Sequence, residues 1–269
     1  VASVVKAFRN LRIGQISTRP RPFLSVKVNE GELLERFGIE LVPINGTEIT
    51  NTINDFLENH EEEIKKEMEV IYSEVNCDAV SETYVRNTAA LVLTFQYLAE
   101  RYGCTAFASE CWEVIPQNFD IWPCYAFGRL SELGIPVGCE TDIHNAISSV
   151  MAVAAARWET EVFTSDLTIR NPYNDNSELL WHCGPFPRTL AKEDSKPCMV
   201  GKCVGQYEIK GGDLTMVRLG AGDGKYTLLA EEVKGCDGPI TNGNYIWVET
   251  EDWPKLERKF MYGPYIHHV

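Results

Sequence analysis

Residues 135–158 read IPVGCETDIHNAISSVMAVAAARW, and this stretch joins one expected strand directly to one expected helix. The run IPVGC is short and apolar and follows Gly134, which is typical of a buried strand. Asp142 then provides a helix N-cap, and the residues from there to Trp158 are mostly apolar. The stretch therefore predicts a strand–helix unit of a parallel sheet.

The same alternation extends through the earlier part of the chain. Strands are expected at residues 11–16, 40–43, 104–109 and 135–139, and helices at residues 30–37, 48–74, 78–102, 124–133 and 142–158. Alternation of this kind indicates an α/β fold with an open parallel sheet that helices cover on both faces. Functional groups in such sheets gather at the carboxyl ends of the strands.

The sequence changes character near residue 160. Period-two and Gly-rich segments follow, namely EVFTSDLTI (161–169), YEIKGG (207–212), LTMVRLG (214–220), KYTLLAEEV (225–233) and YIWVET (245–250). Such segments, separated by glycine-containing turns, are typical of antiparallel strands. We therefore expect an α/β domain over residues 1–158 and a mainly antiparallel β domain over residues 159–269.

Charge and hydropathy narrow the classes of function. The 269 residues include 25 basic and 39 acidic side chains, which gives a formal net charge of −14. A surface this acidic repels phosphate backbones and anionic membranes. No apolar run in the sequence is long enough to span a bilayer, and the first residues show no signal-peptide pattern. We therefore expect neither a nucleic-acid nor a membrane partner.

The nine cysteines are scattered through apolar stretches. Their odd number and the absence of zinc-type spacing favour reduced thiols in a cytoplasmic protein. The sequence also contains no HExxH, GxSxG, GxGxxG or P-loop motif. The sequence therefore lacks the usual signatures of zinc proteases, serine hydrolases, dinucleotide-binding proteins and nucleotide hydrolases.

Two carboxylates stand out by their positions. Glu140 directly follows the strand IPVGC, at the edge where open α/β sheets place ligands. Alternatively, Glu140 lies at a helix N-terminus, where its negative charge would interact favourably with the helix dipole and its carboxylate would cap free amides. Asp166 lies within the apolar segment VFTSDLTI, where an ionised carboxylate needs a partner or a cation.

Three histidines could complete a metal site with these acids. His182 closes an apolar segment before a Gly-Pro turn, a place where a histidine is more often a satisfied core residue. His267 and His268 are adjacent, and neighbours on a strand point to opposite faces, so at most one would serve one site. Two carboxylates and one or two imidazoles form a mixed oxygen and nitrogen donor set, which suits a divalent ion such as Mn²⁺.

His182 is also a candidate for substrate binding, together with two further side chains. Trp112, between two glutamates in the loop after an expected strand, could offer an apolar face to a sugar. Packing over the core is an equally good interpretation of this tryptophan. Arg19, in the segment STRPRPF, could orient substrate oxygens or form part of an interface.

Several longer motifs occur in a distinctive order: GRLSELGIPVGCETDIHNAISSVM, VFTSDLTIRNP, ELLWHCGPFP and the terminal GPYIHHV, with LRIGQISTRPRPF, NEGELLERFGIELVPI and ASECWEVIPQ before them. Together they resemble the metal-dependent L-fucose isomerase and L-arabinose isomerase family, and most of all fucose isomerase-like proteins. The resemblance covers nearly the whole chain. Family members carry an additional N-terminal α/β domain and continue past the histidine pair, so the resemblance implies a C-terminal portion truncated at both ends.

Position by position, the resemblance implies that Glu140 and Asp166 are metal-binding and catalytic carboxylates. It implies His268 as the histidine ligand, with His267 as a less favoured substitute, and His182 matches a further histidine ligand of the arabinose branch. The implied reaction is a Mn²⁺-dependent aldose–ketose isomerisation of a monosaccharide through an enediolate. The full-length protein would form a homo-oligomer, a trimer or a hexamer. Which carboxylate is the base stays open.

Two other functions are compatible with the same residues. A non-catalytic sugar-binding or regulatory relative would keep the fold and bind sugar without a metal. An oligomer-assembly module would be folded and inert. Metal titration separates the first of these from an isomerase, and we expect little turnover from a chain that lacks the first domain, even if it binds metal.

Overall fold

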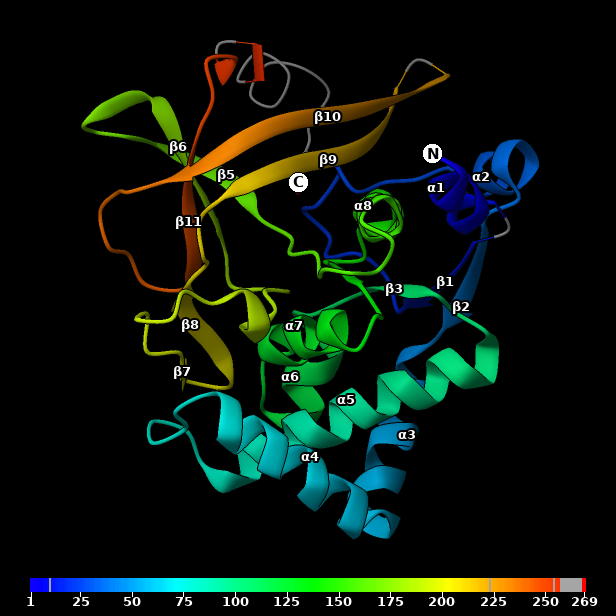
Figure 1. Ribbon diagram of the computed structural model, residues 1–269. Coiled ribbons are helices and arrows are strands. Elements are labelled where there is room, and N and C mark those ends of the chain that lie inside the picture. Colours follow the sequence, from blue (N-terminus) through cyan, green and yellow to red (C-terminus); the bar gives the residue numbers. More distant parts are fainter. Residues whose placement is uncertain (10, 223, 254, 257–267) are drawn as a thin grey trace.

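The structure is a computed structural model that describes residues 1–9, 11–222, 224–253, 255–256 and 268–269. It contains a parallel sheet flanked by helices and a second, mainly antiparallel sheet (Figure 1). The expected α/β fold class is therefore confirmed. The division of the chain into domains at residue 158 stays a prediction.

The first sheet has four parallel strands in the order β2-β1-β3-β4. Their bounds are β1 (Arg12–Ile16), β2 (Glu40–Ile44), β3 (Ala106–Ser109) and β4 (Val137–Cys139). The chain leaves β1 toward β2 on one side and then crosses back to β3 on the other. This reversal places a crevice at the carboxyl ends of β1 and β3, which is where sheets of this kind bind ligands.

Eight helices are described: α1 (Ala2–Phe8), α2 (Glu30–Phe37), α3 (Gly46–Asn59), α4 (Glu61–Glu74), α5 (Glu82–Tyr102), α6 (Val114–Phe119), α7 (Cys124–Glu132) and α8 (Ile143–Ala155). They cover both faces of the parallel sheet (Figure 1). Side chains alternate along β3, so Phe107 packs with α5 and α7 while Ala106 and Ala108 pack with α8. Each face of the sheet thus has its own hydrophobic core.

The acidic region expected as one helix over residues 48–74 is two helices. His60 separates them, with φ of −124° and ψ of 43° outside the helical range. The three glutamates that follow it form the first turn of α4, where negative charge favours a helix N-terminus. The helix expected from residue 78 begins at Glu82, because the Ser81 hydroxyl caps it by accepting the Tyr84 N–H at 3.3 Å.

The second sheet contains β5 (Asp166–Asn171), β6 (Asn174–His182), β7 (Cys198–Val200), β8 (Val204–Glu208), β9 (Asp213–Gly222), β10 (Lys225–Cys236) and β11 (Asn244–Glu249). Its main path runs β5-β6-β11-β10-β9 with antiparallel pairings. β8 pairs with β11 in parallel and with β7 in antiparallel orientation. This sheet agrees with the antiparallel strands expected after residue 160.

The expected strand over residues 161–169 was placed too early. β5 begins only at Asp166, because the residues before it pair with other segments. Thr164 N–H donates to the Pro185 carbonyl at 3.1 Å, and Ser165 exchanges two backbone hydrogen bonds with Val269 at 3.0 and 2.9 Å. Asp166 is therefore the first residue of β5 and not the middle of a strand, and the segment with His268 lies beside it.

Helix α8 lies between the two sheets (Figure 1). Its apolar side chains pack against one face of β3. On the other side of the helix, the Ser148 hydroxyl accepts the N–H of Leu219 in β9 at 2.8 Å. The start of the helix comes very close to β4, since a Cβ on Gly138 would lie 2.4 Å from the Asp142 carbonyl oxygen. Only glycine fits there, and this contact fixes the turn that carries Glu140.

None of the helices in the described ranges is long and apolar enough to cross a membrane.

Candidate functional site

The turn after β4 is strained and positions Glu140. Glu140 and Thr141 have φ of 54° and 58°, in the left-handed region that is unfavourable for side chains with a Cβ. Each such residue costs about 1–3 kcal/mol, so the surrounding structure must hold it in place. The Thr141 N–H donates to the Ser109 carbonyl and the Asp142 N–H to the Cys139 carbonyl, both at 3.0 Å. The result is a buried carboxylate at the carboxyl edge of the sheet, with Glu140 only 6% exposed.

Asp142, and not Glu140, is the N-cap of α8. Its Oδ1 accepts the Asn145 N–H at 2.9 Å. Its Oδ2 accepts a hydrogen bond from Arg218 Nη1 at 2.7 Å and lies 3.0 Å from His268 Nδ1. Burial alone would favour the neutral acid, but Arg218 and His268 outweigh it and hold the pKa of Asp142 well below its usual range. The capping role that the sequence left open for Glu140 therefore belongs to its neighbour.

The ionised Asp142 determines how His268 is oriented. Because this carboxylate can only accept, His268 Nδ1 carries a proton and donates to it, and Nε2 faces the interior of the site. Nε2 lies 2.9 Å from Glu140 Oε2 and 4.0 Å from Asp166 Oδ1. Burial disfavours the imidazolium, but the hydrogen bonds to Asp142 and Glu140 raise the pKa of His268 to about 10. A carboxylate behind one ring nitrogen with the other nitrogen facing a ligand is the usual arrangement of a metal-binding histidine.

His182 also directs its Nε2 toward the site, but its Nδ1 is an acceptor. Its Nδ1 accepts the Gly184 N–H at 2.7 Å, so in the neutral ring the proton is on Nε2. Nε2 lies 3.9 Å from Asp166 Oδ2, and the ring packs edge-on against His268 with centroids 5.1 Å apart. This tautomer makes His182 a hydrogen-bond donor toward the interior, which suits substrate binding better than metal binding.

Four distant segments thus bring their side chains together. The ligand atoms of Glu140, His182 and His268 all lie within 4.8 Å of one another, and Asp166 approaches both histidines. Two carboxylates and an imidazole nitrogen fit the oxygen and nitrogen donor set that divalent ions such as Mn²⁺ accept. The described residues can therefore hold a metal ion, although this geometry does not select one particular metal.

A second group, Cys111, Cys139 and Glu140, also lies within 4.8 Å, with the two sulfur atoms 3.4 Å apart. The hydrogen bond with Cys111 and burial raise the pKa of Cys139 well above its usual range. A thiol that keeps its proton is a poor metal ligand. The cysteine pair therefore packs behind Glu140, and the carboxylate–histidine group is the better candidate for a metal site.

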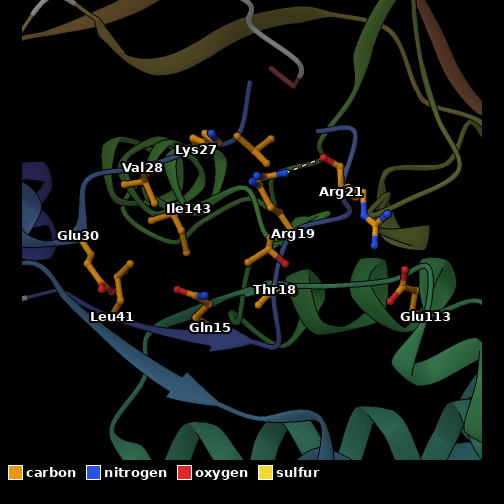
Figure 2. A pocket seen from close by; sticks show the side chains of 12 residues that line it. Gln15, Thr18, Arg19, Arg21, Lys27, Val28, Glu30, Leu41, Glu113 and Ile143 are labelled. Carbon is orange, nitrogen blue, oxygen red and sulfur yellow. Dashed lines mark hydrogen bonds between the residues drawn. The ribbon is translucent and has the colours of Figure 1, made fainter. Parts of the chain in front are cut away.

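Two of the predicted substrate contacts, Arg19 and Trp112, lie outside the carboxylate–histidine group. Arg19 lines a neighbouring pocket (Figure 2), where its Nη1 donates to the Pro20 and Arg21 carbonyls at 3.1 and 3.0 Å. Trp112 is 45% exposed and packs edge-on against Phe23, with ring centroids 4.9 Å apart. His267, the alternative ligand, lies outside the described residues.

Sequence reasoning missed two roles: Asp142 orients His268, and Arg218 pairs with Asp142. Asp142 was considered only as a helix cap, and Arg218 was not considered at all. A signal for Arg218 exists in the segment LTMVRLG, because the arginine shares the period-two face of the buried Met216 on β9. A buried arginine on an inward face requires an anionic partner, and Asp142 is that partner.

Gly184 leaves the space that His182 needs. A Cβ at Gly184 would lie 2.3 Å from Nδ1 of His182 and 2.5 Å from its Cε1. The Gly184→Ala substitution is therefore expected to displace the ring and to lower the free energy of unfolding by about 1–3 kcal/mol. Urea unfolding measures this loss. The control is Gly222→Ala, where a Cβ meets nothing within 4 Å and the change should stay below about 0.5 kcal/mol. Equal effects of the two substitutions would contradict the expectation.

No protein-family model matches this chain. The chain is similar to sulfoquinovose isomerases of Alkalicoccus urumqiensis (26% identity over 251 residues), Priestia aryabhattai (24% over 244) and Clostridium sp. strain MSTE9 (22% over 195). These alignments cover 89%, 88% and 71% of this chain, but 54%, 53% and 42% of the relatives. The chain therefore spans about half the length of the curated relatives it matches. These relatives are named as sulfoquinovose isomerases and not as L-fucose isomerases.

Proposed function

We propose that this chain carries the metal-binding and proton-transfer groups of an aldose–ketose isomerase. The proposal depends chiefly on one observation. Glu140, Asp166 and His268 converge, and Asp142 orients His268 so that its Nε2 faces the two carboxylates. The named relatives, which are sugar isomerases, support the same class of reaction.

Glu140, Asp166 and His268 would hold the ion. When bound, a divalent ion such as Mn²⁺ would polarise neighbouring oxygens of an open-chain sugar and acidify the adjacent carbon-bound proton. The chain's own acids move that proton. Glu140 or Asp166 takes it from the carbon beside the carbonyl and returns it to the carbonyl carbon through an enediolate form of the sugar, while the hydroxyl proton of the first carbon passes to the former carbonyl oxygen.

The burial of these groups supports proton transfer to and from carbon. Glu140 is 6% exposed and His268 is fully buried, so their interactions are only weakly screened by water. The Asp166 side chain is 25% exposed and marks the side from which a sugar can enter. The Nε2–H of His182 would donate to a sugar oxygen near Asp166, and Trp112 would offer its exposed face to the carbon chain.

Two sources suggest the sugar. The sequence motifs resemble enzymes of the L-fucose and L-arabinose type, whereas the relatives are named for sulfoquinovose. We propose an open-chain monosaccharide as substrate, and these three sugars are the first to test. The resemblance also leads us to propose a homo-oligomer, a trimer or a hexamer, for the full-length protein.

The test combines metal binding with turnover. Mn²⁺ added to metal-free protein is expected to raise the unfolding free energy, by about 2.7 kcal/mol when the free ion is at roughly 100 times its Kd. The full-length protein should then convert an aldose to its ketose, and a chelator should stop the conversion. Sugar binding without any effect of Mn²⁺ on stability or turnover would instead indicate a non-catalytic sugar-binding protein.

A further inference from the structure

Two buried cysteines lie directly behind Glu140. Cys139 is the last residue of β4, and Cys111 follows the end of β3 by two residues. Because β3 and β4 pair in parallel, with Ser109 opposite Cys139, both thiols lie at the carboxyl edge of the first sheet. Their sulfur atoms are 3.4 Å apart, and Cys111 and Cys139 are only 5% and 1% exposed. The edge that carries the proposed catalytic carboxylate therefore also carries a pair of thiols.

Both cysteines are held in place by their surroundings. The buried carboxylate of Glu110 accepts three backbone N–H groups around the start of α6, and these hydrogen bonds fix the loop that carries Cys111. The segment after β6 covers Cys139, since a Cβ on Gly184 would lie 3.5 Å from its sulfur atom. The two thiols are thus positioned before any ligand arrives, which lowers the entropic cost of binding one.

The cysteine pair and Glu140 together form a set of three donors. A carboxylate oxygen of Glu140 lies within 4.8 Å of both sulfur atoms. Bonds from zinc to sulfur are about 2.3 Å long and bonds to carboxylate oxygen about 2.0–2.2 Å. An ion between the two sulfur atoms can therefore bind both and has the carboxylate within reach. Among the described residues, no other cysteines belong to a group of three possible metal ligands.

Sulfur selects a different kind of ion from the carboxylate–histidine group. Thiolates favour soft or borderline ions such as Zn²⁺ and Cd²⁺, whereas Mn²⁺ favours oxygen ligands. Each thiol that binds an ion releases its proton to solvent, so the ion must gain enough from sulfur to displace two protons. Mn²⁺ gains too little to do so. The two donor groups should therefore bind different ions.

We propose that Cys111, Cys139 and Glu140 form a binding site for a thiophilic cation such as Zn²⁺ or Cd²⁺. This sulfur site shares Glu140 with the carboxylate–histidine group, where the same carboxylate lies 2.9 Å from His268 Nε2. An ion at the sulfur site draws Glu140 away from its proposed role with Mn²⁺ and inhibits the isomerase. The inhibition rests on the proposed function, whereas the sulfur site itself does not.

The probe is Cd²⁺, because cadmium–thiolate bonds give an ultraviolet charge-transfer band that carboxylate and imidazole ligands do not give. Titration of the reduced, metal-free protein should develop this band with one tightly bound equivalent of Cd²⁺. The Cys111→Ser substitution should weaken Cd²⁺ binding by at least about 100-fold and remove most of the band. It should leave the Mn²⁺ affinity within about twofold, because no sulfur belongs to the carboxylate–histidine group.

The matched control is Cys104→Ser. Cys104 is also buried, at 7% exposed, but lies outside the three-donor group, so this variant should keep both the band and the affinity. X-ray absorption of the wild-type protein with one bound Cd²⁺ should show two sulfur neighbours, and it provides the test if Cys111→Ser fails to fold.

Three results would overturn the proposal: no tight Cd²⁺ binding, tight binding without sulfur neighbours, or a band that survives unchanged in Cys111→Ser. Mn²⁺-dependent turnover of the full-length protein is scored separately. A sulfur site that forms without any loss of turnover would count against the role of Glu140 in the isomerase and not against the sulfur site.

Discussion

Replacing Glu140 with Gln is expected to weaken Mn²⁺ binding by about 100-fold or more and to lower isomerase turnover by roughly 10²–10⁴-fold. The amide keeps the size of the side chain but removes the charge that faces His268 Nε2 at 2.9 Å. The helix cap is supplied by Asp142 and stays intact, so the fold should be retained. Calorimetric Mn²⁺ titration of the metal-free protein and a ketose assay of the full-length protein measure the two effects.

The matched control is Glu69→Gln, on the exposed face of α4. It changes the net charge equally at a position without a role in the site, so its Mn²⁺ affinity should equal that of the wild type. If Glu140→Gln bound the ion as tightly as this control, the assignment of Glu140 as a ligand would be wrong.

Replacing Arg218 with Met is expected to lower the free energy of unfolding by about 3–5 kcal/mol, because it leaves the carboxylate of Asp142 without its buried cation. Arg218 and Asp142 are 2% and 0% exposed, and their atoms are 2.7 Å apart. Asp142 also holds His268, so Mn²⁺ affinity should fall by roughly 10–100-fold as well. Urea unfolding and metal titration measure these losses.

The comparison is Arg157→Met, which breaks the exposed ion pair with Glu159 at 2.9 Å. An exposed pair contributes only about 0–1 kcal/mol, so this variant should be nearly neutral. Arg218→Lys restores a positive charge and should recover part of both losses. A small effect of Arg218→Met on stability would show that Asp142 is not held as an ionised group.

Much of the fold could be predicted because local signals agreed with the global arrangement. The helix after β4 begins where Asp142 caps it, and the strands of the first sheet follow short apolar runs. The predicted boundaries of strands were wrong where pairing between distant segments sets them. β5 begins at Asp166 because Ser165 pairs with Val269, a contact between residues that no local pattern connects.

The acids of the candidate site could be predicted from the sequence, but the surroundings of its histidines could not. Position at a strand end pointed to Glu140, and an acid in an apolar segment pointed to Asp166. The tautomers of His182 and His268 could not be predicted, because each depends on what lies behind the ring, Gly184 N–H in one case and Asp142 in the other. Arg218 was missed because its anionic partner, Asp142, is the N-cap of α8 and lies far from β9 in the sequence.

The pairing of Ser165 with Val269 also affects how the protein is made. Glu140 and Asp166 leave the ribosome long before His268, so a nascent chain has the acidic half of the centre without its imidazole. The proposed ligand set is complete only once the segment that carries His268 has paired with Ser165. Cation capture would then be a late event in biosynthesis, and incompletely translated chains would not sequester the ion.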